Sequence, residues 1–302
     1  MLRALAPGKV NLSLFLGGTR ADGRHELVTA IESVSLADEL TLSIFGGSDS
    51  VVCAGVSGRN LALDALWALR AAGWGAPAVR LSIVKRVPVA AGMGGGSADA
   101  AAAFRLAGAF DPLPDGFDLV AAASDVGADV PSQLAPGLTL GVGAGDEITA
   151  VAAIADHELV IVPLDFSLST AAVYAQADRL ALGRSSVLLA DLRDRLLDAL
   201  SHGGARLSEE LLVNDLEPAA ISLCPEIAVA LDEVRAAGAD HAFLAGSGPT
   251  VVGLFWGFDG RARLAAEALA AARPRAIPVV PVDSSYGEPQ PVGAVRHNLY
   301  PK

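Results

Sequence analysis

The stretch Pro88–Asp99, PVAAGMGGGSAD, has the residue pattern with the clearest chemical meaning in this chain. Its four glycines, Gly92, Gly94, Gly95 and Gly96, lie between a predicted strand and a predicted helix. Glycines let the backbone approach a ligand closely, and the helix start adds free N–H groups and a positive dipole end. This predicts a loop that binds a di- or triphosphate. It is neither a Walker A loop nor a G-x-G-x-x-G fingerprint, and a flexible linker is the alternative.

Three further short motifs carry residues that could act beside a bound phosphate. In PGKVNLSL, Lys9 and Asn11 are two apart on a predicted strand, so their side chains project from the same face. In VGADVP, Asp129 lies between a helix end and a proline, where the backbone has little freedom. Taken alone, such an aspartate is more often a turn former than a catalyst. The motif LAGSGPT at 244–250 has the composition of a hairpin turn.

The elements that must position these motifs fall into two groups. The first half predicts a hairpin at 139–151, helices at 60–73, after the glycine loop and at 116–126, and strands at 10–16, 27–36, 39–45 and 79–89. The strands at 27–36 and 39–45 are expected to be separate, with the break near Asp38.

The second half restarts near residue 155 and is rich in helices. It predicts helices at 169–182, 187–200, 225–238 and 260–272, and strands at 158–164, on both sides of the 244–250 turn, and at 276–282. This order suggests a split β-α-β sandwich of ferredoxin type. Residues 284–302, with Pro and Gly throughout, are expected to form a loose tail. We therefore expect an α+β protein with domains at 1–155 and 156–302.

Composition excludes several classes of protein. The 302 residues are 52% hydrophobic and 19% charged, which does not fit a disordered chain. The net charge of −12 disfavours a nucleic-acid partner. No run reaches the roughly 18 apolar residues of a membrane span, and the N-terminus lacks the apolar core of a signal peptide. The two cysteines, Cys53 and Cys224, form no CxxC pair, which favours the cytoplasm over an oxidising compartment.

In their order and spacing, the four motifs together resemble those of the GHMP kinases. Within that superfamily, ADGRHEL (21–27) and NDLEP (214–218) are similar to segments of the 4-diphosphocytidyl-2-C-methyl-D-erythritol kinases. The resemblance covers about residues 5 to 285. It implies an N-terminal domain of ribosomal-protein type, a C-terminal ferredoxin-like sandwich, and an active site between them. The implied reaction moves the γ-phosphate of ATP to the 2-hydroxyl of a cytidine-diphosphate-linked methylerythritol, in the non-mevalonate route to isoprenoids.

The resemblance also implies roles for individual residues. Asp129 would be the catalytic base and Lys9 its charged partner. The substrate would be held by Asn11 at the polyol, and by His25, Arg24 and Tyr174 at the cytosine. The implied ATP site comprises Asn60 and Lys85 near the adenosine, and Pro88, Val89, Ala90, Ala91, Gly92, Met93, Gly94, Gly95, Gly96, Ser97 and Ala98 around the phosphates. Mg²⁺ would accompany the ATP, with Ser97 as a possible ligand or a helix cap.

The sequence departs from the family pattern before His25, where Arg24 replaces a tyrosine that stacks on cytosine. Because a guanidinium is planar, we expect Arg24 and Tyr174 to clamp the base from opposite faces. Asp99, in the first turn after the glycine loop, could repel phosphate. Two other functions stay open: a kinase of the same superfamily acting on another small alcohol, and a nucleotide-binding regulator without catalysis.

Overall fold

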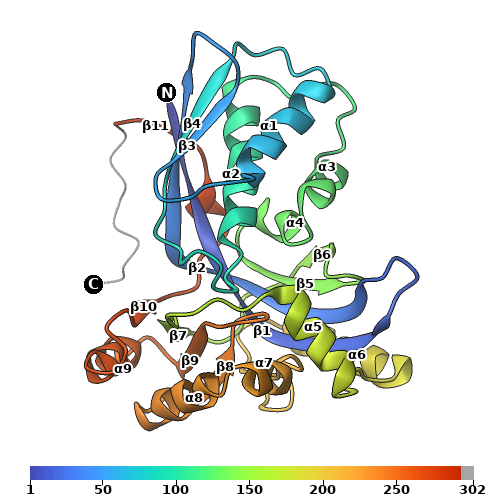
Figure 1. Cartoon of the computed structure of the whole chain (residues 1–302), viewed down its shortest axis with the longest axis vertical. Helices are drawn as coiled ribbons and strands as arrows, with labels where there is room; N and C mark the ends of the chain where they lie inside the picture. The colour runs from blue at the N-terminus through green and yellow to red at the C-terminus, as the bar shows by residue number, and fades with distance from the viewer. Residues whose placement is uncertain (294–302) are drawn as a thin grey trace.

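The computed structural model describes residues 1–293, which form a seven-stranded and a four-stranded sheet (Figure 1). The N-terminal half, in blue and green, builds most of the upper part, and the C-terminal half, in yellow to red, builds most of the lower part. Among these residues no helix is both long and apolar enough to cross a bilayer. The α+β architecture predicted above, with two sheets, is therefore present.

Two long strands, β1 (Leu2–Thr19) and β2 (His25–Ile44), form an antiparallel hairpin through both halves. The predicted break near Asp38 is wrong, because β2 is continuous there. An aspartate is normally unfavourable inside a strand. Asp38, however, is fully buried and accepts hydrogen bonds from Lys85 Nζ and from the amides of Arg86 and Val87. A satisfied buried carboxylate thus replaces the expected turn.

The rest of the first sheet extends from β2. The C-terminal part of β2 pairs with β4 (Val79–Val84), and β4 pairs in parallel with β3 (Ser50–Cys53). The N-terminal part of β2 pairs with β5 (Leu138–Val142), and β5 pairs with β6 (Glu147–Ala150). One face is covered by α1 (Leu61–Ala71), α2 (Gly95–Phe110), α3 (Leu119–Val126) and α4 (Val130–Gln133).

The alanines of α2 explain how this layer packs. Ala98 and Ala100–Ala103 are buried, so small side chains allow α2 to lie close to both the sheet and α1. The predicted cap at Asn60 is confirmed, since its side chain accepts from the amide of Ala62 at 3.0 Å. The small side chains of α2 thus let the helix that begins at the glycine loop pack closely against the sheet.

The second sheet has the ferredoxin-type topology expected from the sequence. Its strands are antiparallel in the order β10 (Ile277–Val279), β7 (His157–Val162), β9 (Val251–Trp256), β8 (His241–Leu244). Val160 and Val162 face a core shared with α5 (Thr170–Arg179), α7 (Glu217–Leu223), α8 (Glu226–Ala236) and α9 (Arg261–Leu269). Leu159 and Ile161 face the opposite core, shared with the β1–β2 hairpin and α6 (Ser186–Ser201). The two sheets are therefore joined by continuous apolar packing.

The segment after the second sheet returns to the first. A 3₁₀ turn (Ser284–Gly287) leads to β11 (Gln290–Pro291), which pairs with the start of β1. The expected loose tail is therefore wrong for 284–291, while 294–302 lie outside the described residues. Arg105 of α2 is partly buried and donates to the carbonyl oxygens of Gly287 (3.0 Å), Leu5 (2.8 Å) and Gln133. The domain boundary at 155/156 stays a prediction.

Candidate active site

A buried polar chain on the β1–β2 hairpin forms the floor of the site. Lys9 Nζ donates to Asn11 Oδ1 (2.9 Å), Asn11 Nδ2 donates to Thr29 Oγ1 (2.8 Å), and Thr29 Oγ1 donates to the carbonyl of Ser13 (2.7 Å). The two-residue spacing of Lys9 and Asn11 does place their side chains together, as predicted. Because every link has a partner, the Lys9 ammonium is held in one position.

Asp129 reaches this floor from the first residue before α4. Its Oδ2 lies 3.5 Å from Lys9 Nζ. The lysine side chain is 6% exposed and the aspartate side chain 43% exposed, so the carboxylate opens into the cavity while the cation lies beneath it. The pair combines a fixed positive charge with an accessible proton acceptor.

The glycine loop lies beside this pair and leads into α2. The backbone amide of Lys9 donates to the carbonyl of Met93 at 2.9 Å, which ties the loop to β1. Gly94 is the N-cap of α2 with φ +64°, and it offers no side chain to cap the helix. Ser97, two residues inside the helix, therefore is not the N-cap. The first amides of α2 thus point out of the helix without a capping side chain.

The loop also touches the turn of the LAGSGPT motif. Gly92 has φ +78°, and a Cβ there would lie 2.4 Å from the carbonyl oxygen of Ala245. A side chain at this position would push the two segments apart. Two of the motifs found in the sequence are thereby in direct backbone contact.

A cavity of about 310 Å³ opens on the outer side of the loop. It is lined by Asn60, Lys85, all residues from Pro88 to Ser97, and also Cys53, Val56, Arg59, Leu61 and Asp99. Ala98 lines neither this cavity nor the larger one below; it is buried in α2, and its amide bonds to the carbonyl of Gly94 at 2.8 Å. The structure thus groups the other residues expected at a nucleotide site.

Lys85 lies between two carboxylates under this cavity. It donates to Asp99 Oδ2 at 2.8 Å and to Asp38. Burial alone would lower the pKa of Lys85, but Asp99 and Asp38 outweigh burial and raise it. Burial, with Asp38 nearby, raises the pKa of Asp99. The carboxyl group of Asp99, which could have repelled a phosphate, thus faces the ammonium group of Lys85.

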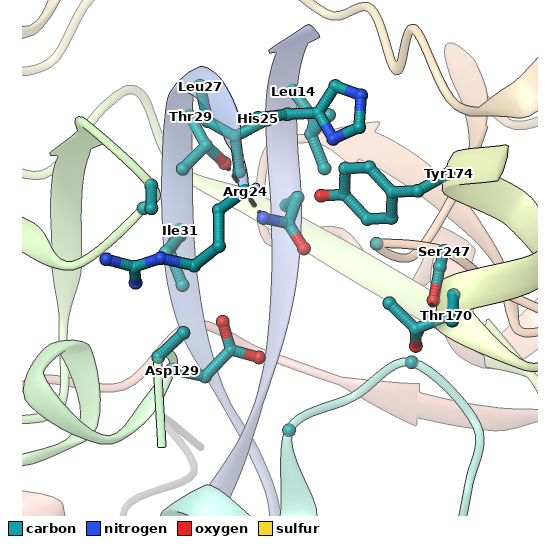
Figure 2. A pocket seen from close by; sticks show the side chains of 18 of the residues that line it. Leu14, Arg24, His25, Leu27, Thr29, Ile31, Asp129, Thr170, Tyr174 and Ser247 are labelled. Carbon is teal, nitrogen blue, oxygen red and sulfur yellow. Dashed lines mark hydrogen bonds between the residues drawn. The ribbon is translucent and has the colours of Figure 1, made fainter. Parts of the chain in front are cut away.

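A second cavity, of about 770 Å³, lies on the inner side of the loop (Figure 2). Lys9, Asn11, Arg24, His25, Asp129 and Tyr174 all line it, which brings together every residue expected at the acceptor. Gly92, Gly94 and Ser97 line both cavities, so the two meet at the glycine loop and next to the Lys9–Asp129 pair.

One face of α5 forms a wall of this cavity. Thr170, Tyr174 and Asp178 follow one another at four-residue intervals, so they lie on the same side of the helix, and all three line the cavity. Thr170 Oγ1 and Ser247 Oγ are 2.9 Å apart. The sequence reading missed Thr170, Asp178 and Ser247. The four-residue spacing from Tyr174 was the signal that could have found two of them.

The tip of the β1–β2 hairpin forms the facing wall. Figure 2 shows Arg24 and Tyr174 on opposite sides of the cavity with His25 between them at one end. The guanidinium of Arg24 is paired with Asp146 (2.7 Å) and Asp22 (3.1 Å). His25 packs on Tyr174 with ring centroids 5.1 Å apart. Burial raises the pKa of the Tyr174 phenol, with Asp129 a second cause, so its hydroxyl stays protonated.

This arrangement suits transfer of a phosphoryl group between two bound molecules. One cavity offers backbone amides and a helix N-terminus, the other offers a polar chain and an aromatic wall, and a cation–carboxylate pair lies at their junction. Phosphoryl transfer depends mainly on positioning and on charge neutralisation, and these groups can provide both. No group of three His, Cys, Asp or Glu side chains that could hold a metal occurs within residues 1–293.

Comparisons with known proteins agree with this geometry. Residues 60–137 match the GHMP kinases N terminal domain, and residues 195–273 match the GHMP kinases C terminal family. The 4-diphosphocytidyl-2-C-methyl-D-erythritol kinase of Streptomyces avermitilis is 38% identical over 287 residues, covering 91% of this chain and 95% of that protein. The kinase of the same name from Mycolicibacterium gilvum is 40% identical over 256 residues, covering 81% of this chain and 79% of that protein.

Solved structures give the same result. A crystal structure of 4-(cytidine 5′-diphospho)-2C-methyl-D-erythritol kinase superposes with a TM-score of 0.73 at 33% identity, over 92% of this chain and 98% of that chain. A homoserine kinase from Cytophaga hutchinsonii, at 16% identity and a TM-score of 0.65 over 96% of each chain, shares the fold. With its motifs, its paired cavities and these relatives in agreement, the chain belongs to the 4-diphosphocytidyl-2-C-methyl-D-erythritol kinase family of ATP-dependent GHMP kinases.

Proposed function

We propose that this protein transfers the γ-phosphate of ATP to the 2-hydroxyl of 4-diphosphocytidyl-2-C-methyl-D-erythritol. The observation that carries the proposal is the Lys9–Asp129 pair, 3.5 Å apart, at the junction of the two cavities. A phosphate held by the glycine loop and a hydroxyl held over the hairpin would meet at this pair. The family membership supports the choice of nucleotide and acceptor.

In the proposed step Asp129 orients the acceptor hydroxyl and takes its proton as the new O–P bond forms. The bond between the γ-phosphorus and its bridging oxygen breaks, and ADP leaves. Lys9, fixed by Asn11 from below, stabilises the negative charge that develops on the transferred group. General-base assistance of this kind contributes about 10²–10⁴-fold.

The smaller cavity is the proposed ATP site, with the phosphates on the free amides at the start of α2. A Mg²⁺ ion bound with the ATP would neutralise part of the negative charge of the phosphates. Hard oxygen donors suit Mg²⁺, and most of its ligands at such sites are phosphates and water. Ser97, which lines both cavities, and the exposed carboxylate of Asp129 fit that requirement.

The cytosine of the acceptor is proposed to lie between Tyr174 and the hairpin tip. Tyr174 offers a ring face, and Arg24 bounds the cavity on the other side, held there by Asp146 and Asp22. Because two carboxylates already neutralise the charge of Arg24, its contribution to cytosine binding is the flat surface of its guanidinium, which completes this wall of the cavity. Stacking of a base on an aromatic ring is worth ~1–3 kcal/mol.

Mass analysis after incubation with ATP, Mg²⁺ and the cytidine-diphosphate methylerythritol tests the proposal. The acceptor should gain one phosphoryl group, and Asp129→Asn should remove that product while leaving ATP binding intact. ADP release in the presence of another alcohol alone would point to a different acceptor, which Arg24 in place of the family tyrosine would explain. Nucleotide binding without turnover on any acceptor would favour a regulator.

A further inference from the structure

The segment 214–218, NDLEP, is part of the family resemblance, but the reaction proposed above gives it no role. Its first residue, Asn214, is buried and lies against the 244–250 turn. Asn214 Nδ2 donates to the carbonyl oxygens of Leu244 and Gly246, both at 2.7 Å, and its Oδ1 accepts from the amide of Leu216 at 2.9 Å. Both amide hydrogens of this side chain are therefore used, and both hold the turn.

The next residue of the segment fastens it to β1. The backbone amide of Asp215 donates to the carbonyl oxygen of Leu14 at 2.9 Å. In return, Asp215 Oδ2 accepts from the amide of Leu16, also at 2.9 Å. Asn214 therefore reaches the turn from a support that is attached to the strand carrying Lys9.

The turn that Asn214 holds lies against the centre of the site. A Cβ on Gly246 would lie 3.3 Å from both Lys9 Nζ and Asn11 Oδ1, and 3.2 Å from the carbonyl oxygen of Gly92 in the glycine loop. The next residue, Ser247, lines the larger cavity, as Figure 2 shows. A small movement of this turn would therefore loosen the packing around the lysine and beside the glycine loop at the same time.

We propose that Asn214 is a positioning residue for phosphoryl transfer, which keeps the 244–250 turn pressed against Lys9 and the glycine loop. This rests on the proposed function, because it assumes that Lys9 acts on the transferred phosphoryl group. Asn214 lines neither of the two cavities, so it acts through the turn and not on a substrate. A carboxamide suits this place, since two carbonyl oxygens and one backbone amide need two donors and one acceptor, which an ionised aspartate of the same shape would not supply.

The experiment compares Asn214→Ala, the milder Asn214→Ser and a matched control, His241→Ala, in steady-state kinetics with ATP and the cytidine-linked acceptor. His241 Nε2 donates to the carbonyl oxygen of Leu212 at 2.6 Å, so it joins the same two parts of the chain at the other end of β8, and it lines neither cavity. Asn214→Ala should lower kcat about 10- to 100-fold, the cost of a small misplacement near the reacting groups. Its acceptor KM should change less than kcat, because the wall proposed for the cytosine is formed by the hairpin tip and α5. Asn214→Ser, which keeps one donor, should fall between Asn214→Ala and the wild type, and His241→Ala should keep the wild-type kcat even if its melting temperature falls.

Hydrogen exchange at the turn supplies a second readout that needs no turnover. The amide of Ala245 donates to the carbonyl of Thr250 and the amide of Gly248 donates to the carbonyl of Ala245, so both report whether the turn is closed. Both amides should exchange about 10-fold faster in Asn214→Ala than in His241→Ala.

A wild-type kcat in Asn214→Ala, an equal loss of kcat in His241→Ala, or unchanged exchange at the two amides would overturn the proposal. If Asn214→Ala does not fold, Asn214→Ser is held to the same comparison with His241→Ala. A wild-type protein that makes no product from the cytidine-linked acceptor would instead refute the proposed function, while the exchange rates would still decide whether Asn214 holds the turn.

Discussion

The coupling between Lys9 and Asp129 can be measured with a double-mutant cycle. The variants are Lys9→Met, which keeps the length of the buried stem, Asp129→Asn, and both together. At 3.5 Å two unit charges interact by about 1 kcal/mol in water and about 5 kcal/mol at an effective dielectric of ~20. Because Asp129 is 43% exposed, solvent screens the pair, and we expect a coupling of about 1–3 kcal/mol, or roughly 5- to 150-fold in rate.

The assay is steady-state ADP release with saturating ATP and the cytidine-linked acceptor. Each single variant should lower kcat by about 10²–10⁴-fold, and the double variant should lose much less than the product of the two single losses. The KM for ATP of Asp129→Asn should stay close to that of the wild type. If the two losses multiply, the two side chains act independently and the reasoning from their proximity is refuted. A fall in melting temperature of Lys9→Met alone would mark a folding defect instead.

Three more predictions follow from the two cavities. Gly95→Val should raise the KM for ATP, because even a Cβ there lies 3.3 Å from Lys85 Nζ. Gly75→Val, where a Cβ would have no atom within 4 Å and which lines neither cavity, is the matched control for ATP titration. Tyr174→Ala should raise the acceptor KM by about one to two decades at constant ATP affinity, whereas a core role alone would lower only the melting temperature. Burial raises the pKa of Asp99 from 3.8 in the unfolded chain to about 7 in the folded protein. Between these two pH values the folded protein therefore binds one proton more than the unfolded chain. Relative to Asp99→Asn, the wild type should therefore lose stability as pH rises from 4 to 8, and an unchanged difference in melting temperature would contradict this.

Helices and loops could be predicted from the sequence where a local signal and the tertiary structure agree. Asn60 before an apolar stripe predicted the start of α1, and the glycines at 92–96 predicted the loop before α2, because capping and backbone freedom are local properties. Asp38 misled the prediction, since its partners come from the 85–87 segment far along the chain. Short elements such as α4 and α7 were missed, since a single turn or two shows little periodicity.

The same division holds for the site. Lys9, Asn11 and Asp129 were found through motifs that stand out in the sequence, and the structure brings them together. Asp178 lies in no motif, and Ser247, although it belongs to the 244–250 motif, was not expected at the acceptor site. They reach the acceptor cavity because α5 packs against the hairpin tip and the 244–250 turn. This contact joins segments far apart in the chain, so it cannot be predicted from the spacing of residues.

The burial of Arg105 limits where this chain can be shortened. Its guanidinium, whose pKa burial lowers to about 10, is held by backbone carbonyls from β1, α4 and the returning segment at Gly287. Ending the chain before residue 284 would remove one of these acceptors and uncover a cation under α2, the helix that begins at the glycine loop. A buried donor left without its acceptor costs about 1–3 kcal/mol, and more when it is charged. The 3₁₀ turn at Ser284–Gly287 thus helps to hold the helix that begins at the glycine loop, although Gly287 lies 182 positions beyond Arg105 in the chain.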